Sequence, residues 1–121
     1  MKIKTVLITG ANGAIGQGLC KSFKKLGWRV IAVDIAESCL FDIDNYIAID
    51  LNKLCKDNHY REMCIDRIQH DCTEGLDALI NNAATQILAP IEGLSFEDWQ
   101  TTINVNLNSI FLLTQAMLSK L

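Results

Sequence analysis

The chain lacks the features of a membrane-spanning, secreted or nucleic-acid-binding protein. It contains no run of about 18 or more apolar residues, the length that a transmembrane helix needs. Its 14 acidic side chains outnumber its 11 lysines and arginines, so we expect neither nucleic acid nor a membrane surface as a partner. No small-residue cleavage site follows the short apolar stretch within residues 1–9. We therefore expect no signal peptide and a cytoplasmic location.

A disulfide framework is also missing. The five cysteines are odd in number and none forms a CxxC pair, which argues against a secreted, disulfide-bonded domain. Cys55 and His59, four positions apart, could share a helix face and bind zinc. The spacings to Cys64, His70 and Cys72 match no structural zinc pattern, so we predict no metal site.

Proline occurs only once, and short apolar runs alternate with longer helical patterns. The runs predict strands at 5–8, 29–33, 46–49 and 76–80, and the longer patterns predict helices at 14–26, 56–71 and 96–119. The residues predicted to face inward are Ile15, Leu19, Phe23 and Leu26 in the first helix, Tyr60, Met63, Cys64, Ile68 and Cys72 in the second, and Phe96, Trp99, Ile103, Leu107, Ile110 and Met117 in the third. This alternation predicts an α/β fold with a parallel sheet, in a single domain over residues 1–121.

The strongest chemical signal is the segment TGANGAIG at residues 9–16, which follows a predicted strand and opens a predicted helix. Gly10 permits a tight turn, and Gly16 permits close packing of the helix on the sheet. The amides at the helix N-terminus then face an anion such as a pyrophosphate. An ordinary glycine-rich turn is the alternative, but the strand and helix on either side favour nucleotide binding. The residues predicted to bind the cofactor here are Gly10, Asn12, Gly13, Ala14, Ile15 and Gly16.

Asp34 closes the second predicted strand, 24 residues after Gly10, where a carboxylate can accept both hydroxyl groups of an adenosine ribose. Two unit charges about 4 Å apart repel by about 4 kcal/mol at an effective dielectric constant of about 20. A 2′-phosphate would meet that repulsion, and Ile35 supplies no guanidinium to offset it. The sequence therefore predicts NAD rather than NADP as the cofactor. A helix cap is the alternative role for Asp34, although Ser38 could serve there.

Three later segments carry further motifs, two of them directly after predicted strands and one within the last predicted helix. They are Asp50-Leu51, Asn81-Asn82-Ala83-Ala84 and Val105-Asn106-Leu107. Together with the glycine loop, these segments resemble the N-terminal half of the short-chain dehydrogenase/reductase family, in its ordinary rather than its extended branch. The resemblance runs from Lys4 to the C-terminus. It implies a Rossmann-like doubly wound parallel sheet with strand order 3-2-1-4, truncated before the family's later strands.

The resemblance also implies cofactor-binding roles outside the glycine loop. Asn82, Ala83 and Ala84 correspond to the family's NNAG motif, which passes near the adenosine ribose and the nicotinamide, with Ala84 in place of the usual glycine. Asp50, followed by Leu51, corresponds to the acidic residue that contacts the adenine amino group. A simple turn aspartate remains an equal alternative for Asp50.

By the same resemblance, Asn106 is the helix asparagine of the catalytic tetrad, which holds a water that relays protons to a lysine. A polar residue in the middle of a helix is the alternative. The family's general acid/base is a tyrosine followed four residues later by a lysine, but at that spacing Tyr46 is followed by Asp50 and Tyr60 by Cys64. We therefore expect this chain alone to be inactive, and an alcohol or ketone substrate to be turned over only if the missing half is supplied.

Two other functions stay open: a non-catalytic NAD-binding or regulatory module, and one chain of a split dehydrogenase. Strand 76–80 would form an apolar sheet edge, and the last helix is apolar on several sides. The resemblance implies that this helix joins a four-helix dimer interface. Besides the dinucleotide, we therefore expect a second copy or a complementing chain as partner, and a chain that is only marginally stable alone.

Overall fold

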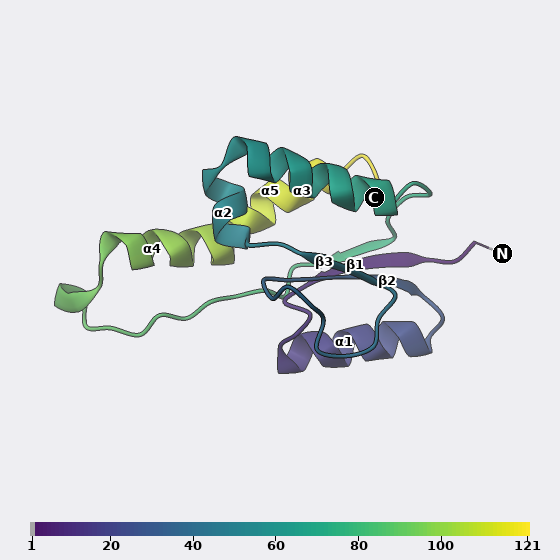
Figure 1. Ribbon diagram of the computed structural model, residues 1–121, viewed down its shortest axis with the longest axis horizontal. Coiled ribbons are helices and arrows are strands. Elements are labelled where there is room, and N and C mark those ends of the chain that lie inside the picture. Colours follow the sequence, from purple (N-terminus) through teal and green to yellow (C-terminus); the bar gives the residue numbers. More distant parts are fainter. Residues whose placement is uncertain (1) are drawn as a thin grey trace.

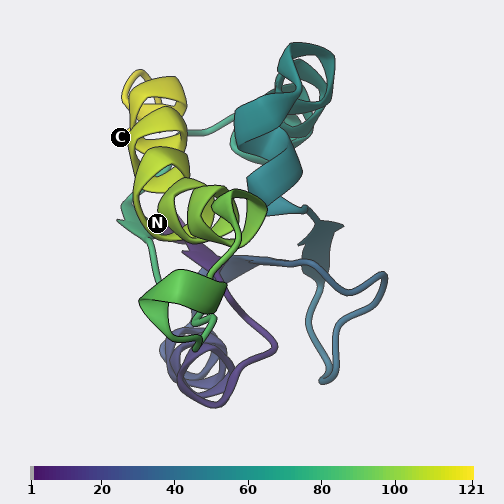
Figure 2. The ribbon, with the colours of Figure 1, turned by 90° about the vertical axis from the view of Figure 1, so that its left-hand side faces the viewer.

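The structure, a computed structural model, describes residues 2–121 as a parallel β-sheet with helices on both faces. Figure 1 shows α1 (Ala14–Lys25) on one face and α2 (Leu51–Lys56), α3 (Asn58–Asp71) and α5 (Ser109–Met117) on the other. Figure 2 shows the same three layers after a 90° turn. The alternation of strands and helices predicts the parallel sheet, and this layering is the doubly wound arrangement that the family resemblance implies.

The sheet has four parallel strands in the order β3-β2-β1-β4, which confirms the predicted order 3-2-1-4. The strands are β1 (Thr5–Thr9), β2 (Arg29–Asp34), β3 (Asn45–Ala48) and β4 (Ala78–Ile80). Helices cover both faces, so every residue of β1 is buried and its centre is apolar on both sides. All four predicted strands are present, with ends shifted by at most two residues.

Apolar side chains gather in two clusters on opposite faces of the sheet. Because successive strand residues point to opposite faces, Val6 and Ile8 pack with Cys20 of α1, whereas Leu7 packs with Leu113 of α5. The two layers therefore share the central strand β1, and the segment that follows β1 is held from both sides.

α1 turns a different face inward from the predicted one. Gly16 and Cys20 are buried, whereas Ile15 and Leu26 are 73% and 75% exposed. The prediction for Ile15 and Leu26 is wrong, because Gly16 lets the helix approach so closely that its line of contact runs through Gly16 and Cys20. Leu19, beside that line, is partly buried as expected.

The predicted helix at 56–71 is preceded by a separate helix, α2, that the sequence does not predict. The two helices meet at Asp57, whose backbone is extended and whose carboxylate accepts a hydrogen bond from the N–H of Tyr60. Cys64 is buried as predicted, but Met63 is 55% exposed, which contradicts the prediction. Met63 is exposed because α3 meets the rest of the molecule through a narrow stripe on which Cys64 lies.

The predicted helix at 96–119 is interrupted by a π-helical turn, η2 (Asn104–Asn108), between α4 (Phe96–Ile103) and α5. A π turn shifts the helical phase. The residues buried beyond it are Ser109, Leu113 and Met117. Three residues predicted to face inward are instead exposed: Phe96, Trp99 and Leu107. α4 and the connection before it, with its short turn η1 (Ile91–Gly93), extend beyond the sheet (Figure 1), so no other element covers them.

From residue 2 to residue 121, no helix is both long and apolar enough to cross a membrane. Over the same part of the chain, no three histidine, cysteine, aspartate or glutamate side chains are grouped as metal ligands would be. All five cysteines are free thiols, and three of them are buried: Cys20, Cys64 and Cys72.

Candidate functional site

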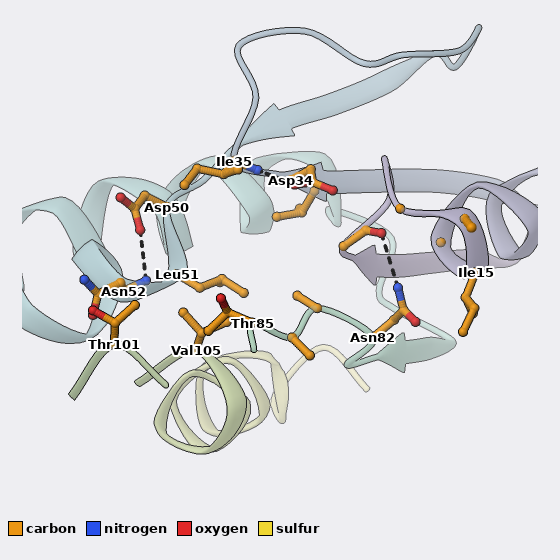
Figure 3. A pocket seen from close by; sticks show the side chains of 17 residues that line it. Ile15, Asp34, Ile35, Asp50, Leu51, Asn52, Asn82, Thr85, Thr101 and Val105 are labelled. Atoms are coloured by element: carbon orange, nitrogen blue, oxygen red, sulfur yellow. Dashed lines mark hydrogen bonds between the residues drawn. The ribbon is translucent and has the colours of Figure 1, made fainter. Parts of the chain in front are cut away.

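A cavity of about 630 Å³ opens at the carboxyl ends of the strands (Figure 3). Each strand brings one predicted site residue to its wall, because Gly10 follows β1, Asp34 ends β2, Asp50 follows β3 and Asn82 follows β4. From β1 the chain proceeds outward to β2 and β3 and then crosses to β4 on the other side. The carboxyl ends of β1 and β4 therefore form a topological switch point, the place where doubly wound sheets bind ligands.

Gly10 and Gly16 are required by packing. Gly10 has a φ of 67°, in the left-handed region, and a Cβ there would lie 2.8 Å from the Cα of Ala83. A Cβ on Gly16 would lie 1.9 Å from the carbonyl oxygen of Gly10. The glycine loop therefore lies against α1 and against the end of β4 at distances that a side chain would prevent.

The N-terminus of α1 presents uncovered amides to the cavity. Its N-cap residue is Gly13, which has no side chain to bind them, and the first turn contains no acidic residue. Ala14, Ile15 and Gly16 follow on the cavity wall. First-turn amides carry partial positive charge, so this wall can bind a pyrophosphate without a cationic side chain.

Two backbone amides hold the carboxylate of Asp34 at the cavity. Oδ2 accepts a hydrogen bond from the N–H of Asn12 at 2.8 Å, and Oδ1 accepts one from the N–H of Ile35 at 2.7 Å; Figure 3 shows the second bond. These bonds use about two of the four acceptor sites of a carboxylate and leave the others for hydroxyl groups. No helix begins between Asp34 and Leu51, so Asp34 is not a helix cap.

Asn12 alone among the predicted cofactor-binding residues does not line the cavity. Its side-chain Oδ1 accepts a hydrogen bond from the N–H of Leu40 at 2.9 Å. Its Nδ2 lies 3.4 Å from both the carbonyl oxygen of Ser38 and the hydroxyl of Tyr46. The side chain of Asn12 thus binds the segment that follows β2.

Asn82 joins the end of β4 to the glycine loop. Its Nδ2 donates hydrogen bonds to the carbonyl oxygens of Thr9 and Gly10, at 3.1 and 3.2 Å; Figure 3 shows the bond to Gly10. The buried hydroxyl of Thr9 in turn accepts hydrogen bonds from the N–H groups of Asn82 and Ala83, at 3.1 and 3.0 Å. These bonds fix the carboxyl end of β4 against the carboxyl end of β1, on the two sides of the switch point.

Asn106 clamps the backbone just beyond that motif. Its Oδ1 accepts from the N–H of Thr85 and its Nδ2 donates to the carbonyl oxygen of Thr85, both at 2.8 Å. Thr85 and Val105 line the cavity, and Asn106 lies behind that wall, in the π turn.

No non-glycine residue among residues 2–121 has a positive φ, so Ala84 replaces the family's glycine without backbone strain.

Asp50 has a structural role as well as a place on the wall. Its Oδ1 accepts hydrogen bonds from the N–H groups of Asn52 and Lys53, at 3.0 and 3.2 Å, which caps α2. Leu51, the next residue, is buried in the core and also lines the cavity.

Asp34 and Asp50 are the only charged side chains on this wall as the structure describes it. No lysine, arginine or histidine of residues 2–121 joins them there. A bound dinucleotide would therefore depend on main-chain amides for its pyrophosphate, and a further phosphate near Asp34 would meet repulsion without a counter-ion.

The cavity also has wall residues that the sequence does not predict: Val33, Ile35, Asn52, Thr85, Thr101 and Val105. Thr85 and Val105 are neighbours of predicted motif residues, so adjacency in the sequence could have indicated them. Asn52 and Thr101 belong to α2 and α4, and only the folded chain brings these helices to the cavity.

Neither tyrosine lines the cavity. The hydroxyl of Tyr46 donates to the carbonyl oxygen of Ala36 at 2.6 Å, and burial, followed by the negative charge of Asp34, raises its pKa. The hydroxyl of Tyr60 accepts from the N–H of Asp50 at 2.9 Å, and burial raises its pKa too. Both phenols stay protonated at neutral pH, so neither is prepared for general acid/base chemistry in this cavity.

The parallel sheet in the order 3-2-1-4, the glycine loop at its switch point and the carboxylate that ends β2 define the Rossmann-type dinucleotide-binding class. Residues 4–121 match the family model of the short chain dehydrogenases. The chain belongs to this family of oxidoreductases.

Known relatives agree with this assignment. The chain is 29% identical over 125 residues to the acetoacetyl-CoA reductase of Acinetobacter sp. (strain RA3849). This alignment covers 98% of the chain and 50% of the reductase. It superimposes with a TM-score of 0.82 on a short chain dehydrogenase from Leptospira borgpetersenii with bound NAD+, at 28% identity, covering 98% of the chain and 46% of that structure. A 4-hydroxyisoleucine dehydrogenase complexed with NADH also gives a TM-score of 0.82, at 27% identity, with 96% and 48% covered. The chain thus spans about half the length of the relatives it matches.

Proposed function

We propose that residues 1–121 form one NAD-binding domain of an oxidoreductase that acts on CH–OH groups. The observation that carries the proposal is the carboxylate of Asp34, held beside the glycine loop in a cavity to which residues 2–121 contribute no cationic side chain. A carboxylate in that place accepts ribose hydroxyls and repels a 2′-phosphate. NAD is therefore the proposed cofactor, in preference to NADP.

The residues present fit a dinucleotide. The packing that excludes a Cβ at Gly10 and Gly16 lets the main chain approach a ligand closely. The amides at the start of α1 would hold the pyrophosphate, Asp34 the adenosine ribose, and Asp50 the adenine amino group. NAD, when bound, supplies the group that accepts a hydride from an alcohol.

The proton-transfer part of the reaction needs a tyrosine and a lysine, and neither is among the described residues that line this cavity. Asn106 is proposed to hold the wall at Thr85 and, in the whole protein, to order a water for proton relay. Tyr46 and Tyr60 lie outside the cavity. We therefore propose that the tyrosine and lysine of the family come from chain outside residues 1–121 or from a complementing chain.

The first test is the variant Asp34→Ala, titrated with NAD and NADP by calorimetry. Loss of two hydrogen bonds to a charged acceptor, each worth about 1.5–3 kcal/mol, should weaken NAD binding by about 100-fold or more. NADP should be affected less, because the variant also removes the repulsion of its 2′-phosphate. The preference for NAD over NADP should therefore narrow.

Asp44→Ala is the matched control. Asp44 is an exposed carboxylate in the segment between β2 and β3 that does not line the cavity, so its removal changes the net charge equally. It should leave both affinities within about twofold, which is a change of well under 1 kcal/mol. A preference that stays unchanged in Asp34→Ala would show that Asp34 is not the ribose ligand.

A non-catalytic NAD-binding module is the second candidate. The composition of the wall favours it, since no tyrosine, lysine, histidine or cysteine of the described chain lies there. Incubation of the chain with NAD and a panel of secondary alcohols, followed by absorbance of NADH, tests what the two candidates share, namely that residues 1–121 alone do not turn over an alcohol. Turnover by the chain alone would contradict both this candidate and the proposed need for outside residues.

A further inference from the structure

We infer that Asn12 is a positioning residue for the adenosine ribose: its side chain fixes segment 35–40 against the glycine loop and so sets where Asp34 and Ile35 stand. The inference rests on the proposed function, because it concerns the ribose end of the NAD site. It assigns to Asn12 an action through other residues, in place of the direct ligand contact that the sequence predicts.

Among the described residues, Asn12 makes the hydrogen bonds that join the glycine loop to Asp34 and to segment 35–40. The main-chain N–H of Asn12 donates to Oδ2 of Asp34 at 2.8 Å. Its Oδ1 accepts from the N–H of Leu40 at 2.9 Å, and its Nδ2 lies 3.4 Å from the carbonyl oxygen of Ser38. Asn12 thus contacts Asp34, which immediately precedes segment 35–40, and Ser38 and Leu40 at the end of that segment.

Segment 35–40 has little else to hold it. It contains no helix or strand, and the side chains of Ile35 and Leu40 are 66% and 70% exposed. Its other hydrogen bond to a distant residue runs from the hydroxyl of Tyr46 to the carbonyl oxygen of Ala36, at 2.6 Å. The raised pKa of Tyr46 keeps that hydroxyl protonated and able to donate at neutral pH. Local burial is therefore too small to define the path of the segment, and the polar contacts from Asn12 and Tyr46 define it instead.

The path of this segment matters because Ile35 lies on the cavity wall next to Asp34 (Figure 3). The N–H of Ile35 donates to Oδ1 of Asp34, so a shift of the segment also turns the carboxylate. A fixed segment keeps the carboxylate ready for ribose hydroxyls and confines the space beside it. If the segment were released, the carboxylate of Asp34 would no longer be held ready for ribose hydroxyls, and space for a 2′-phosphate would open beside it. Asn12 therefore contributes to both affinity and cofactor choice.

Asn12→Ala is the test variant, because it removes the side-chain contacts and keeps the N–H that binds Asp34. Tyr46→Phe is a second, milder variant that removes only the hydroxyl contacts. Gln17→Ala is the matched control: Nε2 of Gln17 donates to the carbonyl oxygen of Asn12 at 2.8 Å, so this variant loosens the same residue without touching segment 35–40.

Two measurements are made on each variant. Amide hydrogen exchange of the chain without ligand reports on the segment itself. Asn12→Ala should speed exchange across residues 35–40, most of all at the N–H of Leu40, which loses its acceptor. Calorimetry then compares ADP with 2′-deoxy-ADP and NAD with NADP. Asn12→Ala should reduce the preference for ADP over 2′-deoxy-ADP, and for NAD over NADP, by about 3- to 10-fold, the effect of one hydrogen-bonded contact.

Each outcome separates the inference from the function on which it rests. Wild-type chain that binds neither NAD nor ADP would overturn the proposed function and the inference with it. Binding by the wild type, with both preferences unchanged in Asn12→Ala and Tyr46→Phe, would overturn the inference alone. A lower melting temperature with unchanged preferences would assign Asn12 a purely structural role. Reduced preferences in both variants, absent from Gln17→Ala, would support the inference.

Discussion

Gly16 and Gly18 lie in the same helix, α1, but have different surroundings. A Cβ on Gly16 would lie 1.9 Å from the carbonyl oxygen of Gly10, whereas a Cβ on Gly18 would meet nothing within 4 Å. Steric need for glycine is therefore a property of one position and not of the helix. Alanine at Gly16 and alanine at Gly18 therefore form a matched pair of variants. They test the close packing of the glycine loop on α1, on which cofactor binding is proposed to depend.

Gly16→Ala should lower the free energy of unfolding by about 1–3 kcal/mol, because the glycine loop must move away from α1. It should also abolish NAD binding. Gly18→Ala should raise the free energy of unfolding by about 0.5–1 kcal/mol, because alanine is the better helix former at an open position. Urea denaturation and calorimetry measure both effects, and equal losses in the two variants would contradict the packing argument.

The buried cysteines give a prediction about reactivity. Burial raises the pKa of Cys20 to about 11, and it also raises the pKa of Cys64 and of Cys72. The reactive thiolate is thus scarce at these positions at neutral pH. In the folded chain these three residues should resist iodoacetamide, and Cys20 should still resist it when the pH passes the ordinary thiol pKa of about 8.5. In urea all the cysteines should react, as mass spectrometry of peptides can show; rapid labelling of folded Cys20 would contradict its burial.

At the scale of elements, α2 depends on its cap. The helix has only six residues, Leu51–Lys56, and is too short to persist by propensity alone. Asp50 stabilises it by accepting hydrogen bonds from the first-turn amides of Asn52 and Lys53. The same helix places Leu51 in the core and Asn52 on the cavity wall, so the cap also supports the site.

Asp50→Ala should lower the free energy of unfolding by about 1 kcal/mol through loss of this cap. Asp50→Asn should retain most of that stability, because asparagine caps helices about as well as aspartate. Urea denaturation of the two variants measures the difference. An equal loss in both would attribute the effect to the charge of Asp50 and not to capping.

The predicted helix at 96–119 is interrupted, and the periodicity of its apolar residues does not predict the interruption. The pattern at 96–119 fits one continuous helix, and a π turn cannot be seen in a repeat of apolar residues. The turn stands where Asn106 binds both backbone groups of Thr85 and Asn104 donates a hydrogen bond to Asn52. Both contacts join segments far apart in the sequence, so the phase of α5 follows from tertiary contacts and not from local propensity.

At the scale of the whole molecule, exposed apolar side chains are concentrated in the part of the chain that follows β4. Of the fourteen large exposed apolar side chains among residues 2–121, eight lie there: Leu88, Ile91, Phe96, Trp99, Leu107, Phe111, Leu118 and Leu121. Over residues 2–121, β4 also has β1 as its only strand neighbour, so its other edge is open. Exposed apolar patches and open strand edges both promote association.

We therefore predict that the chain alone self-associates. Sedimentation velocity should show a mass that increases with concentration, and Phe111→Ser, on α5, should reduce it. Leu26→Ser is the control, because Leu26 is similarly exposed but lies at the end of α1, on the opposite face of the sheet. A monodisperse monomer with a high melting temperature would contradict the prediction.

The sequence by itself determined the alternation of strands and helices, the glycine loop after the first strand and the carboxylate that ends β2, whereas the strand order followed only from the family resemblance. The first three features depend on backbone conformation and periodicity within short segments, which the residues of each segment decide. Only the tertiary structure decided that the side chain of Asn12 binds segment 35–40, that Asn106 clamps Thr85, and that α2 reaches the cavity. These arrangements depend on hydrogen bonds between residues far apart in the chain, and no local pattern encodes which distant partner a polar side chain will meet.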